Sequence, residues 1–110
     1  MELSYKSNKL KKCLTKDKKL RKAFGSRAKK VKQRINQLKA ADDLWTISKM
    51  PQLYLHPHKG RNKGLWSIDV KNNWRMLFSI NHNPIPVKDD GGVDLKKVFQ
   101  IRIEEIVDPH

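Results

Sequence analysis

The alternation of apolar and polar residues between positions 66 and 80 constrains the fold of this chain more than any other feature. Apolar side chains stand at every second position on both sides of Lys71-Asn72-Asn73, a segment rich in residues that tolerate positive φ. This period of two is typical of strands with one buried face, so we expect a β-hairpin. Residues 98–107 alternate in the same way and predict a last strand, which completes an antiparallel meander.

Helical spacing replaces this alternation in the first forty residues. Between Asn8 and Phe24 apolar residues recur at i, i+3 and i+4, with a lapse near Asp17, which predicts an interrupted helix. Gly25 is expected to end that helix, and Ser26 to cap the next one. The second helix presents one apolar face, formed by Ala28, Val31, Ile35 and Leu38.

The remaining segments complete an α+β pattern. Residues 2–6 alternate weakly and are expected to form a short strand, and residues 44–50 are expected to add a helical turn. Segment 81–95 holds two prolines and a Gly-Gly pair, which indicates a loop. The 110 residues are expected to form one domain, spanning 1–110. We therefore predict a helical hairpin that packs its apolar stripe on a small, mainly antiparallel sheet.

The composition indicates a cytoplasmic protein without a membrane segment. Apolar residues make up 37% of the chain, and no run approaches the roughly 20 that a spanning helix needs. The first residues carry lysines but no apolar stretch of the kind found in a signal peptide. Cys13 is the single cysteine, which excludes an intramolecular disulfide and fits a reducing compartment.

Positive charge is concentrated in the segment of the expected helices. The formal net charge of the chain is +14, and residues 1–40 hold fifteen of the 25 lysines and arginines against Glu2 and Asp17, a local charge of +13. Such a field attracts polyanions, of which nucleic acid is the commonest. There are two alternatives: the charge only keeps an exposed helix surface soluble, or it attracts an acidic protein partner. The polyanion interpretation selects seven lysines as binding residues: Lys11, Lys12, Lys18, Lys19, Lys22, Lys29 and Lys30.

The chain carries no motif for metal, phosphate-loop or serine chemistry. His56 and His58 are two residues apart, and a lone cysteine cannot complete a zinc site of the usual spacing. A site built from three of the four histidines stays an alternative. Gly60 and Gly64 precede an expected strand rather than a helix, so they do not form a phosphate-cradling loop. We expect neither a metal nor a cofactor.

The residues that remain suit RNA cleavage without a metal. In this reaction a base removes the 2′-OH proton, the oxygen attacks the adjacent phosphate, and an acid protonates the leaving 5′-oxygen. Histidine supplies the proton transfers near neutral pH, while lysine and arginine stabilise the charge on the phosphorane. The candidates are His56, His58, Lys59, Arg61, Lys63, Arg75 and His110. The alternative is that the histidines only pack, cap or lie on the surface, and that the cations bind phosphate without a role in the chemistry.

Five short motifs follow one another in a set order along the chain. They are Phe24-Gly25-Ser26-Arg27-Ala28, Leu55-His56-Pro57-His58-Lys59-Gly60, Gly64-Leu65-Trp66-Ser67-Ile68-Asp69-Val70, Trp74-Arg75-Met76-Leu77-Phe78 and Val107-Asp108-Pro109-His110. Each motif alone is weak, but together they span nearly the whole chain outside the loop at 81–95. In this combination the chain resembles the HigB group of bacterial toxins, which belong to the RelE/ParE superfamily of type II toxin–antitoxin systems.

The resemblance implies a fold, an activity and partners. The fold would be a helical hairpin on a strongly twisted antiparallel sheet. The activity would be a ribosome-dependent endoribonuclease that cuts mRNA in the A site and so inhibits translation. The partners would be mRNA, the ribosome and a cognate HigA-like, DNA-binding antitoxin, and we expect a monomer when free and a hetero-oligomer with the antitoxin.

The resemblance also implies roles for particular residues. Matched motif by motif, the catalytic residues become His56, Lys59, Arg75, Asp108 and His110. His56 and His110 would form the acid–base pair, Lys59 and Arg75 would stabilise phosphate charge, and Asp108 would orient His110 or the loop. Arg61, Lys63 and the seven helical lysines would then hold mRNA or ribosomal RNA.

One motif departs from the family pattern. Where Asp-Tyr-His is usual, this chain has Asp108-Pro109-His110, so the ring and hydroxyl of the tyrosine are missing and Pro109 lacks a backbone N–H. Stacking of an A-site base then passes to Trp66 or to no residue. Two other functions stay open: a non-catalytic nucleic-acid or antitoxin-binding module, and a gyrase-inhibiting toxin of the same superfamily.

Overall fold

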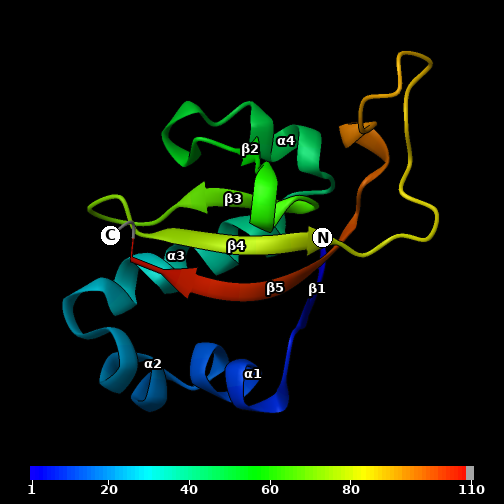
Figure 1. Ribbon diagram of the computed structural model, residues 1–110. Coiled ribbons are helices and arrows are strands. Elements are labelled where there is room, and N and C mark those ends of the chain that lie inside the picture. Colours follow the sequence, from blue (N-terminus) through cyan, green and yellow to red (C-terminus); the bar gives the residue numbers. More distant parts are fainter. Residues whose placement is uncertain (109–110) are drawn as a thin grey trace.

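Five strands and four α-helices make up the structure, a computed structural model that describes residues 1–108 (Figure 1). The strands are β1 (Glu2–Tyr5), β2 (His56–Pro57), β3 (Leu65–Asp69), β4 (Arg75–Ile80) and β5 (Gln100–Val107). The helices are α1 (Asn8–Thr15), α2 (Asp17–Phe24), α3 (Ala28–Ala40) and α4 (Leu44–Ser48). Short 3-10 helices are η1 (Gly25–Arg27), η2 (Pro51–Leu53), η3 (Gly60–Asn62) and η4 (Leu95–Lys97). The expected α+β class is confirmed.

The strands form one mixed sheet in the order β1-β5-β4-β3-β2. The pairs β5–β4, β4–β3 and β3–β2 are antiparallel, whereas β1 runs parallel to β5. A parallel neighbour needs a crossover connection, and here nearly the whole chain lies between the two strands. The meander was predicted as antiparallel, and the parallel edge strand adds to it.

The hairpin at the centre of the sheet follows the predicted pattern. Leu65 pairs with Ser79 and Asp69 with Arg75, so each strand starts or ends within one residue of its expected limit. Asn72 and Asn73 both have positive φ, at 57° and 66°, which asparagine tolerates better than most residues. The Val70 N–H donates to the Trp74 carbonyl at 2.7 Å and closes the turn.

The first helix is interrupted where its apolar face lapses. Lys16 has extended dihedrals between α1 and α2, and it serves as the C-cap of the first helix and the N-cap of the second. The Ser7 hydroxyl accepts from the Leu10 N–H at 3.1 Å and caps α1. Gly25, with φ 55°, ends α2 as predicted, its N–H bonded to the Arg21 carbonyl.

The expected capping role of Ser26 is wrong. Residues Gly25–Arg27 form the short helix η1, so α3 starts at Ala28 with Arg27 in the N-cap position and no side-chain cap hydrogen bond. The preceding 3-10 turn already brings the Ala28 N–H to the Gly25 carbonyl, which leaves this donor satisfied without a serine.

Two residues of the histidine-bearing segment form strand β2. His56 pairs with Ser67 and Pro57 with Trp66 at the edge of the sheet. An edge position accommodates Pro57, which cannot donate a backbone hydrogen bond. The segment 81–95 is largely irregular, as expected, with a single bridge between Val87 and Val93.

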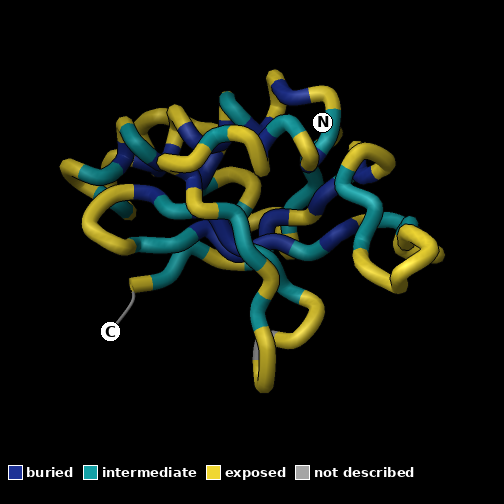
Figure 2. Tube along the Cα trace, turned by 90° about the horizontal axis from the view of Figure 1, so that it is seen from above, coloured by how far each residue is buried: buried dark blue, intermediate teal, exposed yellow. Residues whose placement is uncertain are grey.

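The core lies between the helices and one face of the sheet. Figure 2 shows buried residues along the central strands and the adjoining helices, with exposed residues in the connecting loops. The sheet contributes Ile68, Met76, Phe78, Ile101 and Ile103 to this core, all fully buried. Because side chains alternate along a strand, Arg75, Leu77 and Ser79 point to the other side, which we call the outer face. Within residues 1–108 no helix is long and apolar enough to span a membrane.

Candidate active site

Six side chains gather on or beside the outer face, around the junction of β2, β3 and β4. We call them the outer-face cluster: Tyr54, His56, His58, Ser67, Asp69 and Arg75. The strand register explains their meeting, because His56 is opposite Ser67 and Asp69 is opposite Arg75, and residues opposite each other share one face. Leu77, the other neighbour of Ser67, is 5% exposed and gives the cluster an apolar floor.

The two histidines lie side by side in different environments. Their ring centroids are 4.7 Å apart with planes tilted by 42°. His58 Nε2 is 2.8 Å from the hydroxyl oxygen of Ser67, which is fully buried. Burial of the ring lowers the pKa of His58, and the nearby His56 and Arg75 lower it further. His58 is therefore a neutral imidazole at neutral pH.

His56 is held by a main-chain contact. Its Nδ1 lies 3.0 Å from the carbonyl oxygen of Tyr54. Because a carbonyl only accepts, Nδ1 must carry the proton in this hydrogen bond. In the neutral ring Nε2 is then the unprotonated nitrogen, which is the state a general base requires.

Arg75 is oriented by a carboxylate within the cluster. Its Nη1 is 3.1 Å from Asp69 Oδ1, and both side chains are less than one third exposed. Its guanidinium carbon also lies 5.8 Å from the centre of the Tyr54 ring. A guanidinium has five N–H donors, so a single contact to Asp69 leaves donors for an oxyanion such as phosphate.

A buried arginine connects the helices to this site. Arg34 of α3 is 6% exposed, and its Nε donates to the main-chain oxygen of Asp69 at 2.9 Å. Its Nη1 donates to Gln37 Oε1 at 2.9 Å. Burial lowers the pKa of Arg34, which the attraction of Asp69 partly offsets. The end of β3 that carries Asp69 is thus fixed from the core side.

The other predicted site residues belong to two further segments of the chain. Lys59, Arg61 and Lys63 are exposed in the segment between β2 and β3. Asp108 follows Val107, whose partner across the sheet is Arg75, so it stands near the same end of the sheet. His110 and Pro109 lie outside the described residues.

Trp66 lies on the opposite side of the sheet. Its cross-strand partners are Pro57 and Phe78, and its ring packs against the hydrophobic core. The structure therefore does not bring it together with His56 and Arg75.

Three cluster members were missed from the sequence. Ser67 and Asp69 alternate with apolar residues in β3, which was a usable signal, whereas nothing local marked Tyr54.

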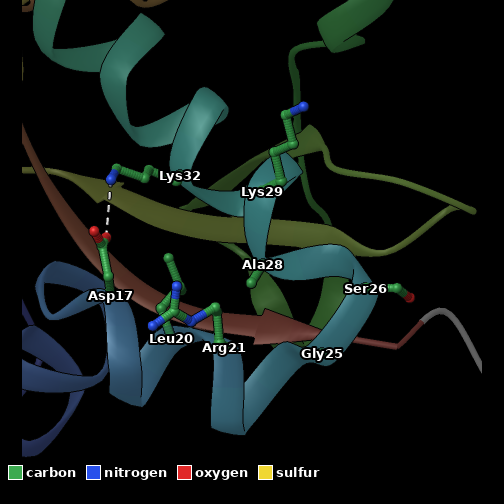
Figure 3. Close-up of a pocket in the computed structure, with 8 residues that line it drawn as sticks. All are labelled: Asp17, Leu20, Arg21, Gly25, Ser26, Ala28, Lys29 and Lys32. Atoms are coloured by element: carbon green, nitrogen blue, oxygen red, sulfur yellow. Dashed lines mark hydrogen bonds and ion pairs between the residues drawn. The ribbon is translucent and has the colours of Figure 1, made fainter.

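Five of the seven lysines predicted to bind RNA border hollows on the helical side. Lys12, Lys19 and Lys22 line a groove of about 700 Å³ between α1 and α2, together with Lys9, Cys13 and Ala23. A pocket of about 390 Å³ lies between α2 and α3 (Figure 3), where Lys32 pairs with Asp17 at 2.8 Å. Lys11, Lys18 and Lys29 are exposed and Lys30 is half-buried. Residues 1–108 contain no group of three or more potential metal-ligating side chains.

The lowered pKa of His58 predicts a pH-dependent stability. The unfolded chain takes up this proton near pH 6.5, before the folded protein does, so stability is lost as the pH falls below about 6.5 and is retained above it. In His58→Gln this contribution is absent. We expect thermal unfolding between about pH 7.5 and about pH 5 to show a larger drop for the wild type than for the variant. Equal drops in the two proteins would contradict the assignment.

The fold and the cluster define a class: a strongly basic α+β protein with imidazole and guanidinium groups gathered on one face of its sheet. The family described as "RelE-like toxin of type II toxin-antitoxin system HigB" matches residues 3–89, most of the chain. The protein therefore belongs to this family of HigB-like toxins, as its motifs predicted. Membership of a type II toxin–antitoxin family implies an antitoxin as partner.

A curated relative agrees with this membership. The protein is similar to "Endoribonuclease HigB" of Proteus vulgaris, with 36% identity over 50 residues. The alignment covers 44% of this chain and 52% of that protein, so it spans about half the length of the relative.

Proposed function

We propose that this toxin is a ribosome-dependent endoribonuclease that cleaves mRNA through its 2′-OH groups, without a metal. The observation that carries the proposal is the meeting of His56, His58 and Arg75 on the outer face of the sheet in a HigB-like toxin. The name of the partial relative, an endoribonuclease, supports the same activity.

The proposed mechanism divides the reaction among five residues. His56 accepts the 2′-OH proton on Nε2, because its Nδ1 faces the Tyr54 carbonyl. Arg75 donates to the phosphate oxygens as negative charge develops on them, and Lys59 adds a second positive charge. His110 serves as the acid that protonates the 5′-oxygen, and Asp108 orients it. Because DNA has no 2′-OH, this mechanism acts on RNA alone.

The helical lysines and the loop cations complete the proposal. Lys12, Lys19 and Lys22 lie along one groove, where they can follow a phosphate backbone of mRNA or ribosomal RNA. The remaining proposed contacts come from Lys11, Lys18, Lys29, Lys30, Arg61 and Lys63. The protein would act in the cytoplasm, where ribosomes are, as a monomer that a HigA-like antitoxin inhibits by forming a hetero-oligomer.

End-mapping of a defined mRNA, incubated with the purified protein with and without programmed ribosomes, tests this function. Cuts at A-site codons only in the presence of ribosomes are the expected result. Cuts on free RNA would retain the chemistry and remove the ribosome from the mechanism. Intact RNA under both conditions would overturn the endoribonuclease and favour a binding module or a gyrase inhibitor.

The lysine groove yields a separate prediction about binding. Lys19→Glu combined with Lys22→Glu is expected to weaken binding to ribosomes and to flatten its salt dependence, by about one unit of slope for each lost phosphate contact. The matched control is Lys88→Glu combined with Lys97→Glu; Lys88 lies on the loop that follows β4 and Lys97 at the end of η4. The measurement is the dissociation constant for ribosomes across a series of salt concentrations. Equal effects of the two double variants would argue for a non-specific charge effect.

A further inference from the structure

Tyr54 has an exposed ring and an uncommon backbone conformation. Its side chain is 60% exposed. It adopts left-handed dihedrals, φ 46° and ψ 53°, directly after η2, with its N–H bonded to the Pro51 carbonyl at 3.1 Å. Residues other than glycine and asparagine rarely adopt this region, and such strain is concentrated at functional sites. The turn directs a large aromatic ring out of the fold rather than into the core.

The ring stands against the groups that would carry out cleavage. It meets the His56 ring edge to face, with centroids 4.9 Å apart and planes at 82°. The guanidinium carbon of Arg75 is 5.8 Å from its centre. The Tyr54 carbonyl also accepts the Nδ1 hydrogen bond of His56. One residue thus positions a proton-transfer group and borders the phosphate-binding cation.

Other aromatic residues of the described chain do not share this place. Trp66 and Trp74 pack against the core, and Phe99 contacts His82 at the far end of the sheet. Trp45 is exposed, but it lines a separate pocket with Leu95 and Lys96. Within residues 1–108, Tyr54 is therefore the exposed ring that adjoins the outer-face cluster.

We propose that Tyr54 forms a nucleobase-binding subsite, on which the base next to the scissile phosphate stacks. Once Arg75 binds that phosphate, the neighbouring base is within reach of a ring 5.8 Å from the guanidinium. Base–aromatic stacking tolerates any base, because every base has a π-face. It would draw the nucleotide out of its own stack and hold its 2′-OH near His56. This inference rests on the proposed endoribonuclease function and names its base-binding residue.

The test measures single-turnover cleavage on programmed ribosomes for Tyr54→Phe, Tyr54→Leu and the wild type. The Phe variant keeps the ring and is expected to cleave within about twofold of the wild type. The Leu variant is expected to lose about 5- to 140-fold in kcat/KM, which is the stacking contribution of about 1–3 kcal/mol per base converted at 1.4 kcal/mol per tenfold. Trp45→Leu is the matched control, because this exposed ring contacts Lys49 and Lys96 away from the cluster, and it should cleave normally.

A second substrate separates stacking from a structural role. An mRNA with an abasic nucleotide beside the scissile phosphate removes the base and leaves the protein intact. We expect the wild type to slow on this substrate, and Tyr54→Leu to cleave it as the wild type does. Equal cleavage of intact mRNA by Tyr54→Leu and the wild type, or an undiminished defect on the abasic substrate, would overturn the subsite. A wild type that cuts no RNA would overturn the proposed function itself, and the subsite with it.

Discussion

Replacing Arg75 by alanine is expected to slow mRNA cleavage on the ribosome by about 10²–10³-fold, the usual loss when one preorganised donor to a developing oxyanion is removed. The reason is its position. Asp69 holds the guanidinium near His58, on the face of the sheet opposite the core. The charge that develops on the phosphorane has no other arginine of the described cluster to stabilise it.

The experiment includes two further variants. Arg75→Lys keeps a positive charge but not the planar fork, so we expect only partial activity. Arg102→Ala is the matched control: Arg102 lies on neighbouring β5 and pairs with Glu104 at 2.7 Å, so it tests the loss of an arginine from an ion pair as such. Single-turnover rates at saturating ribosome concentration are the measurement. If Arg102→Ala lost as much activity as Arg75→Ala, or if neither lost any, the role of Arg75 would be wrong.

The second large effect concerns stability. Arg34→Ala is expected to lower the free energy of unfolding by about 1.5–3 kcal/mol, the range for a hydrogen bond from a charged group. Its Nε is bonded to the Asp69 main-chain oxygen and its Nη1 to Gln37. Alanine would remove the donor from two half-buried acceptors, at a position where Arg34 itself is 6% exposed. Urea unfolding with an unchanged m-value would report the loss.

Arg34→Met distinguishes the charge from the bulk of the side chain. Methionine fills the path of the arginine stem and removes the cost of burying the charge, which is the cost that lowers the Arg34 pKa. We expect Arg34→Met to be more stable than Arg34→Ala. If the alanine variant were as stable as the wild type, the bonds from α3 to the end of β3 would contribute nothing.

The hairpin shows that the alternation of apolar and polar residues predicts which side chains of a strand are buried. Met76 and Phe78 are buried in the core while Arg75 lies on the outer face, as a period of two requires. The interrupted first helix was likewise visible, because its apolar spacing lapses near Asp17. Ser26 was misassigned, because a serine after a glycine favours a cap only if the helix starts there, and a 3-10 turn intervened.

The candidate site was only half visible in the sequence. His56, His58 and Arg75 were named from their chemistry, whereas Tyr54, Ser67 and Asp69 were not. The contact between Asp69 and Arg75 depends on register across the hairpin turn. The contact between Tyr54 and His56 depends on a left-handed backbone at Tyr54, which residue type disfavours.

The sequence by itself determined the α+β class, the basic helical hairpin and the toxin family, because periodicity, charge and motif order are local properties of the chain. Only the tertiary structure decided which aromatic ring adjoins the candidate site. His56 is opposite Ser67, the residue that follows Trp66. Strand alternation nevertheless places Trp66 against the core and His56 on the outer face. The tertiary structure also pairs β1 with β5, a strand nearly one hundred residues away in the sequence. Such pairings arise because distant segments bury their apolar faces in one common core. No segment by itself specifies which other segment it will pack against.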